Sequence, residues 1–210
     1  MLPLLMALLV AAPSPSPSPL RTIETVKSTP FCNALQRHFN GAFVPMLGND
    51  RSFQTVGVQL SDLNTLFTRP TYANDFFVLR SRLMKQVGEI EGSLPQIQSH
   101  IGGLQASAAL ASDPKARADM LAMAGSLQSV YAMQKQIAYD LHGVVQSMME
   151  YDPLAGNHPA GGMDPADIGV PSEMRDIKSY LRYDARRDTM EKAQSTAVDR
   201  ALALAQGRCS

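Results

Sequence analysis

The clearest pattern in the chain is a row of apolar residues that recurs every three or four positions between residues 71 and 111. A β-strand would alternate every two residues, whereas these gaps place side chains on one face of an α-helix with coiled-coil spacing. The row predicts one long helix that Pro95 kinks or interrupts, because proline lacks the backbone donor. Its members are Tyr72, Phe76, Leu79, Leu83, Val87, Ile90, Leu94, Ile97, Ile101, Leu104, Ala108 and Ala111.

A second row with the same spacing follows a break at residues 111–114. Asp113 is a good N-cap and Pro114 a favoured first helical residue, so they predict where a second long helix begins. A short connection makes two long helices antiparallel neighbours, and each would be about 60 Å long. The row contains Met120, Met123, Leu127, Val130, Gln134, Ile137, Leu141, Val144, Met148 and Tyr151, and only Gln134 is polar.

Weaker patterns flank this hairpin on both sides. Thr29 and Pro30 predict the start of a shorter helix, and the Gly-Asn-Asp triplet at 48–50 separates it from another, with a strand as the alternative for residues 52–60. Residues 152–172 are rich in Pro and Gly and predict an exposed loop. A last helix is expected from a cap at Ser172 to a stop at Gly207. Its inward positions are Met174, Ile177, Leu181, Met190, Ala197, Ala201 and Leu204.

The predicted fold class is therefore all-α: an elongated helical bundle built on a long antiparallel coiled-coil-like hairpin, with shorter N-terminal helices and a C-terminal helix. Residues 28–210 form this helical domain. Residues 13–27 begin with alternating Pro and Ser and predict an extended linker. Residues 1–12 form a short apolar block typical of an export signal. No Lys or Arg precedes that block and Pro13 follows it directly, so an uncleaved short anchor and a start further upstream stay open as alternatives.

Composition narrows the class of protein further. Hydrophobic residues make up 45% of the 210 residues and charged residues 18%, which excludes a long disordered charged chain. Lys and Arg balance Asp and Glu at 19 each, so the basic surplus of a nucleic-acid-binding protein is missing. Apart from the N-terminal signal, no apolar run is long enough for a stable membrane span.

The two cysteines, Cys32 and Cys209, lie near opposite ends of the helical domain. An even number of cysteines in an exported chain predicts one disulfide, which would close most of the chain into a loop. Two free thiols are the alternative. The pair does not form Cys-x-x-Cys, so the spacing gives no support for redox catalysis.

The sequence contains no motif that would assign catalytic, cofactor-binding or metal-binding residues. The serine-nucleophile elbow, the phosphate-binding glycine loop and the zinc helix motif are all missing from the sequence. No histidine has Glu three residues before it, as a di-iron bundle needs; the four are His38, His100, His142 and His158. Glu89 and Glu91 are two positions apart and do not share a helix face.

Two groups of side chains could bind a metal ion, although each could also have a purely structural role. Methionine thioethers on the second long helix, with His142, could bind Cu(I), although seam methionines also simply fill a core. The methionines are Met120, Met123, Met148 and Met149. The predicted 152–172 loop also contains side chains that could bind a hard metal ion, but their spacing does not match that of a calcium-binding loop. These residues are Asp152, Asn157, His158, Asp164 and Asp167.

The expected function is that of an exported, non-catalytic helical bundle, periplasmic or secreted, that acts through protein–protein binding or self-association. The expectation depends on helix faces that carry few charges and are rich in Gln, Ser and Ala. Representative positions are Gln86, Gln98, Gln105, Gln128, Gln136 and Gln146. No cofactor and no nucleic-acid partner is expected. The alternative is a bundle in the cell envelope that binds a small ligand or a metal such as copper.

Overall fold

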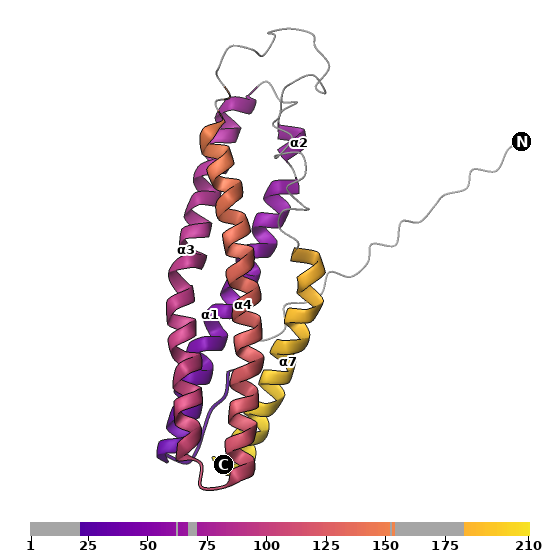
Figure 1. Cartoon of the computed structure of the whole chain (residues 1–210). Helices are drawn as coiled ribbons and strands as arrows, with labels where there is room; N and C mark the ends of the chain where they lie inside the picture. Colours follow the sequence, from indigo (N-terminus) through magenta and orange to yellow (C-terminus); the bar gives the residue numbers. More distant parts are fainter. Residues whose placement is uncertain (1–21, 62, 67–70, 152, 154–182) are drawn as a thin grey trace, which may run out of the picture.

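The computed structural model describes residues 22–61, 63–66, 71–151, 153 and 183–210, and over these ranges the chain is an all-α four-helix bundle without strands (Figure 1). Long antiparallel helices pack in sequential order, α1 on α3, α3 on α4 and α4 on α7. Their bounds are Pro30–Ser61 for α1, Tyr72–Ser107 for α3, Pro114–Glu150 for α4 and Tyr183–Arg208 for α7. Two short elements, α2 (Leu63–Leu66) and a 3-10 turn η1 (Ala108–Leu110), precede and follow α3.

Both predicted apolar rows lie in the core, which confirms the antiparallel hairpin. Leu83 and Ile97 on α3, and Val130 and Leu141 on α4, expose 1% or less of their surface. Three members of the two rows are only partly buried, namely Tyr72, Leu79 and Tyr151. Each large aliphatic side chain buried in this way contributes roughly 1.5–3 kcal/mol, so the seams supply the main driving force for folding.

The predicted cap of the second long helix is also confirmed. Asp113 has an extended backbone, and its Oδ1 accepts a hydrogen bond from the Lys115 backbone N–H at 3.1 Å. Pro114 occupies the first turn, where it needs no backbone donor. The other carboxylate oxygen of Asp113 pairs with Arg208 at the end of α7. One residue thus starts α4 and ties it to the C-terminal helix.

The prediction of two short N-terminal helices is wrong, because α1 is one helix of 32 residues that runs through both Pro45 and the triplet at 48–50. The strand alternative for residues 52–60 is wrong for the same reason. Asn49 is a buried helical residue, and its side chain bonds to other helices instead of forming a turn. Tertiary contacts therefore override the local turn preference of this triplet.

Pro95 does not interrupt α3, contrary to one of the two expected outcomes. The residue lies on the exposed side of the helix. Its missing N–H leaves the carbonyl of Glu91 without a helical partner, and water can reach a carbonyl on that side. The helix therefore tolerates proline at this position.

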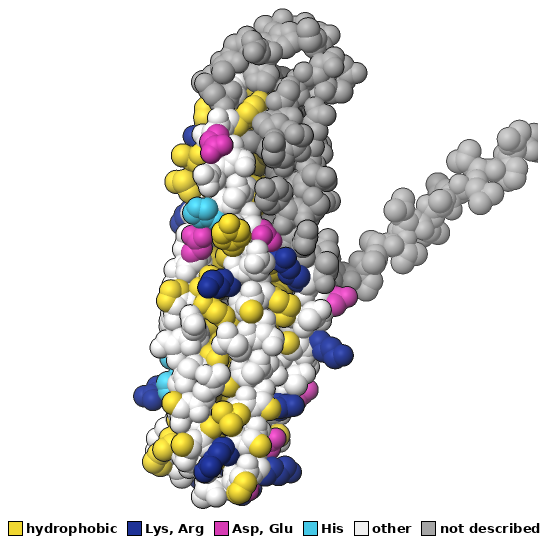
Figure 2. Space-filling model, in the orientation of Figure 1, with side chains coloured by type: hydrophobic (Ala, Val, Ile, Leu, Met, Phe, Trp, Pro, Cys, Tyr) yellow, Lys and Arg dark blue, Asp and Glu magenta, His cyan; other side chains and the backbone are white. Residues whose placement is uncertain are grey.

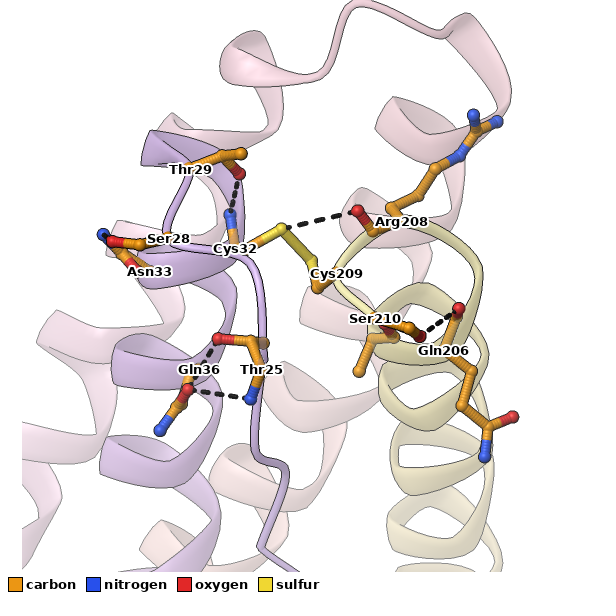
Figure 3. The surroundings of a disulfide bond; sticks show 11 residues. Thr25, Ser28, Thr29, Cys32, Asn33, Gln36, Gln206, Arg208, Cys209 and Ser210 are labelled. Carbon is orange, nitrogen blue, oxygen red and sulfur yellow. Dashed lines mark hydrogen bonds between the residues drawn. A yellow bond between two sulfur atoms is a disulfide. The ribbon is translucent and has the colours of Figure 1, made fainter.

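Residues 22–29 run back along α1, although most of them belong to the predicted linker. Ile23 is buried, and Asn40 both donates to its carbonyl and accepts from its N–H, at 2.9 and 3.0 Å. Gln36 accepts from both the backbone N–H and the hydroxyl of Thr25 (Figure 3). Side-chain amides of α1 thus replace the partner strand that this extended segment lacks, and the packed part of the described chain begins at residue 22.

The predicted disulfide joins Cys32 in the first turn of α1 to Cys209 just after α7 (Figure 3). Their Cα atoms are 5.6 Å apart, and both residues are buried. The Cys209 carbonyl also accepts hydrogen bonds from the backbone N–H groups of Val26 and Lys27. Thr29 caps α1, as predicted, by accepting from the Cys32 N–H at 3.1 Å. In the chain-entropy model a loop of this size is worth about 5 kcal/mol.

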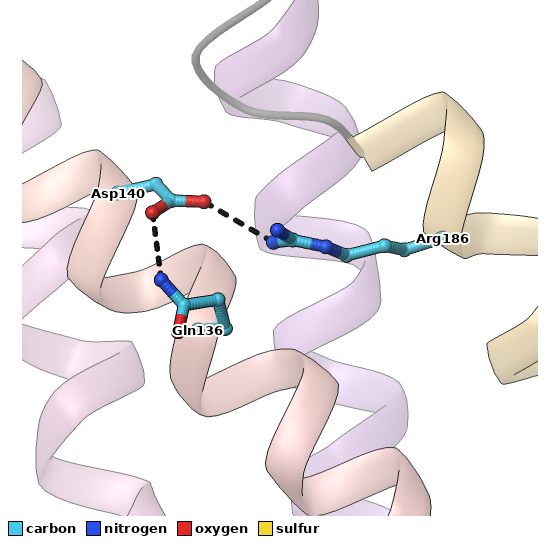
Figure 4. A network of polar contacts seen from close by, with 3 residues as sticks. All are labelled: Gln136, Asp140 and Arg186. Carbon is cyan, nitrogen blue, oxygen red and sulfur yellow. Dashed lines mark hydrogen bonds and ion pairs between the residues drawn. The ribbon is translucent and has the colours of Figure 1, made fainter.

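An ion pair holds the beginning of the described C-terminal helix against α4. Arg186 of α7 contacts the Asp140 carboxylate at 3.1 Å, and Gln136 donates to the other oxygen of Asp140 at 2.9 Å (Figure 4). The Arg186 and Asp140 side chains are only 22% and 16% exposed, so removing either would leave the other charge poorly solvated. The Ser172 cap and, Pro153 apart, the predicted 152–172 loop lie outside the described residues.

No helix among the described residues is long and apolar enough to cross a membrane. The predicted 1–12 signal or anchor lies outside the described residues. That assignment stays a prediction.

Candidate functional site

A layer of polar side chains crosses the core and draws on all four long helices. Gln134, the one polar residue on the α4 seam, is completely buried. Its Nε2 donates to the Met46 carbonyl at 2.9 Å and to the Asp50 carboxylate at 2.8 Å, and its Oε1 accepts from Asn49. Ser93 of α3 donates to Asn49 at 3.0 Å. The three Gln134 contacts join α4 to α1, and the Ser93 contact joins α3 to α1.

Asp50 is the titratable member of this polar layer. Gln194 of α7 donates to its second carboxylate oxygen at 2.5 Å. Burial raises the pKa of the Asp50 carboxyl; the hydrogen bonds from Gln194 and Gln134 act in the opposite direction, and the nearby charge of Glu191 raises it further. The members of the layer satisfy one another, so we interpret it as a device that selects how the four helices pair.

A second polar contact lies between α1 and α3, where two histidines meet. The Nδ1 atoms of His38 and His100 are 3.2 Å apart, and the ring centroids are 5.4 Å apart. A glycine faces each ring from the opposite helix. A Cβ built on Gly103 would lie 2.3 Å from His38, and one on Gly41 would lie 2.5 Å from His100. The close approach of the two helices therefore requires glycine at both positions.

The methionines of the copper alternative do not converge along α4. Met120, Met123 and Met148 are completely buried in the core, while Met149 is 51% exposed. Met120 and Met148 lie about 42 Å apart along one straight helix, and His142 and Met149 about 10.5 Å apart, too far along the axis to face each other as i,i+4 pairs do. Packing accounts for the three buried thioethers. Copper binding stays untested.

The remaining ligand candidates are also dispersed. His142 contacts Glu91 across α3 and α4 at 3.1 Å, and Glu89 pairs with Lys85 at 3.8 Å, so the two glutamates do not act on one group. Among the described residues, no group of three or more His, Cys, Asp or Glu is placed to hold a metal ion. The hard ligands of the 152–172 loop, including His158, lie outside the described residues.

The outward sides of α3 and α4 each carry a row of residues without charged side chains, and we call the two rows together the α3–α4 outer face. Nearly all its members are exposed, and they follow one another every three or four positions. In Figure 2, white and yellow atoms predominate on this side and charged side chains are scattered. The face consists of Gly88, Gly92, Pro95, Ser99, Gly102 and Ala106 on α3, Ala109 on η1, and Ala118, Leu121, Gly125, Gln128 and Ala132 on α4.

Within the part of the chain that the structure describes, the glycines of this face have no packing role. A Cβ at Gly88, Gly92, Gly102 or Gly125 would meet nothing within 4 Å. Glycine in a helix interior costs roughly 1 kcal/mol relative to alanine, so the chain loses helix stability at these positions without an internal gain. Of the glutamines expected on open faces, Gln98, Gln105, Gln136 and Gln146 are exposed, whereas Gln86 and Gln128 are half-buried.

Sequence reasoning identified only part of these features. Gln134 was noticeable as the one polar residue on its seam, but Asn49 and Asp50 resembled a turn, and Gln194 had no distinguishing pattern. A recurring His-x-x-Gly, at residues 38–41 and 100–103, was the available signal for the histidine contact. No protein-family model, no curated protein and no solved structure matches the chain.

Proposed function

We propose that this chain is a non-catalytic helical-bundle protein that acts by binding another helical surface, and first of all a second copy of itself, through the α3–α4 outer face. The observation that carries the proposal is the set of outward glycines that pack against no other side chain among the described residues. A helix can approach another more closely where no Cβ stands between them, and the distance between helix axes depends on the side chains at the contact.

The chemistry of the face supports a protein partner. The centres of protein interfaces are depleted in charged residues, and the α3–α4 outer face has none. Leu121 lies within it at 45% exposure. Tyr139, at 74% exposure, lies one heptad beyond Ala132 on α4, and the exposed Lys135 between them marks the charged edge of the face. Leu121 thus provides a large apolar side chain among small residues, and Tyr139 provides an aromatic side chain at the edge of the face, where binding surfaces are enriched in tyrosine.

Self-association is tested by measuring the molar mass of the purified chain by size exclusion with light scattering, up to high micromolar concentration. We expect a mass that rises with concentration toward a dimer. Gly92→Glu and Gly102→Glu place a charged side chain on the face and should each leave a monomer. A strict monomer for the unmodified chain over that range would overturn self-association.

A matched control separates loss of the face from a general effect of the substitution. Gly48 is an exposed glycine inside α1, where a Cβ also meets nothing within 4 Å, but it lies outside the α3–α4 outer face. Gly48→Glu should associate as the unmodified chain does. Equal loss of association in all three variants would contradict a role for the face itself.

The proposal also places the protein outside the cytosol. The Cys32–Cys209 disulfide supports this, because disulfides persist in oxidising compartments. Mass spectrometry of the protein from its native cells, with and without reductant, should show a shortened N-terminus and a closed disulfide. A full-length cytosolic chain with two free thiols would contradict export.

A further inference from the structure

Two histidines on neighbouring helices hold nitrogen atoms at the spacing that one metal ion requires. The Nδ1 atoms of His38 on α1 and His100 on α3 are 3.2 Å apart. Zinc binds imidazole nitrogen at about 2.0–2.1 Å in tetrahedral geometry, so two histidine ligands of one zinc ion lie about 3.3 Å apart. At the same bond length, neighbouring and opposite corners of a square-planar copper site lie about 2.9 and 4.1 Å apart. The observed spacing is closest to the tetrahedral zinc geometry.

The backbone of each helix restricts the ring that comes from the other helix. The motif His-x-x-Gly occurs on both helices, and because they are antiparallel, each histidine lies against the glycine of its partner helix. The His38 ring occupies the space that a Cβ on Gly103 would need, and the His100 ring occupies that of a Cβ on Gly41. Packing of this kind keeps ligand atoms close to a binding geometry. Both histidines are half-buried, so water can reach the pair and complete a four-coordinate site.

Arg37 opposes a cation at this position and must move when one binds. Its Nη2 lies 3.2 Å from Nε2 of His38, and a guanidinium group only donates, so a neutral His38 without metal carries its proton on Nδ1. A metal ion at Nδ1 takes the place of this proton, which then lies on Nε2 and faces the guanidinium donors. Arg37 is exposed and belongs to the residue next to His38, so its side chain can turn toward solvent without disturbing the helix contact.

We propose that His38 and His100 form a zinc site that bridges α1 and α3, with Nδ1 of each ring as a ligand and water in the other two positions. Metal ions bind the neutral imidazole. Burial, the charge of Arg37 and the proximity of His100 all lower the pKa of His38, which keeps this ring neutral near pH 7. Neither histidine belongs to the α3–α4 outer face, so the site is independent of the proposed self-association.

The site is tested by titrating zinc chloride into the purified, untagged chain at pH 7.5 in a calorimeter. We expect one zinc ion per chain with a micromolar dissociation constant. His38→Gln and His100→Gln should each weaken binding by more than about tenfold, because each removes one of the two ligands. The matched controls His142→Gln and His158→Gln should bind zinc as the unmodified chain does. Binding that requires millimolar zinc, or unchanged affinity in His38→Gln, would overturn the proposal.

Two further measurements identify the atoms that bind. In the unmodified chain, zinc should shift the imidazole nitrogen signals of His38 and His100 together, with Nδ1 as the bound atom of each ring. Arg37→Gln removes a positive charge beside the site and should tighten zinc binding by about three- to tenfold in low salt. Zinc on Nε2 of either ring, a shift of only one of the two histidines, or weaker binding by Arg37→Gln would contradict the site.

Discussion

Gly102 and Gly103 are neighbours in the sequence of α3 but belong to two different regions of the molecule. A Cβ at Gly103 would lie 2.3 Å from the His38 ring, whereas one at Gly102 would meet nothing within 4 Å. The first glycine is required by the contact with α1, and the second faces the open side of the bundle. The same residue type therefore has opposite consequences for stability, and only its surroundings distinguish the two.

The glutamines show the same contrast between positions inside the bundle and positions on its surface. Gln134 is completely buried and serves three partners on α1, while Gln105 is exposed on α3. Inward polar groups hold particular helices together, whereas outward ones such as Gln105 are exposed at the surface of the described chain. Matched substitutions of an inward and an outward residue of the same type can therefore test the assignment of each face.

The largest effect is expected from Gln134→Leu. The substitution fills similar space but leaves Asn49, the Met46 carbonyl and one oxygen of Asp50 without their partner, and unsatisfied buried groups cost about 1–3 kcal/mol each. We expect a loss of about 3 kcal/mol in the free energy of unfolding, measured by urea denaturation. Gln105→Leu is the outward control and should change stability by less than about 0.5 kcal/mol. Equal effects would show that the layer does not stabilise the bundle.

A smaller loss is expected from Gly103→Ala. The added methyl group meets Cγ of His38 at 2.8 Å as well as the ring atoms beyond it, so the side chain cannot escape by moving its tip alone. Overpacking of this kind costs typically 1–3 kcal/mol, offset by about 1 kcal/mol of helix propensity. The net effect in urea denaturation should be a loss of up to about 2 kcal/mol.

A double-mutant cycle tests the cause of that loss. In a His38→Ala background, where the ring is gone, Gly103→Ala should stabilise the chain instead. If Gly103→Ala costs the same with and without the ring, the contact with His38 is not the reason for the glycine.

The long hairpin could be predicted from sequence because its information is local. The α3 and α4 rows repeat every three or four residues, and Asp113 with Pro114 marks the start of α4 next to the residues it caps. Each feature depends on residues only a few positions apart. Such patterns survive in the folded chain because the same seam that predicts the helix also buries it.

The features that escaped prediction depend on residues far apart in the chain. Asn49 and Asp50 are helical because Gln134, Ser93 and Gln194 bond to them, over separations of 44 to 144 residues. His38 and His100 meet across 62 positions. The local sequence Gly-Asn-Asp does favour a turn. A turn preference depends only on neighbouring residues, so it cannot include the distant side chains that keep this segment helical.

The smallest effect, and the one with reversed sign, is expected from Gly102→Ala. No described residue lies within 4 Å of the new methyl group. At low protein concentration the free energy of unfolding should therefore rise by about 0.5–1 kcal/mol through helix propensity and reduced freedom of the unfolded chain. If the α3–α4 outer face brings two helices close together, the same methyl group should weaken association measured at high concentration. A monomer that gains stability and associates more weakly would show that the outward glycines serve a partner. Gain of stability with unchanged association would mean that no partner approaches Gly102.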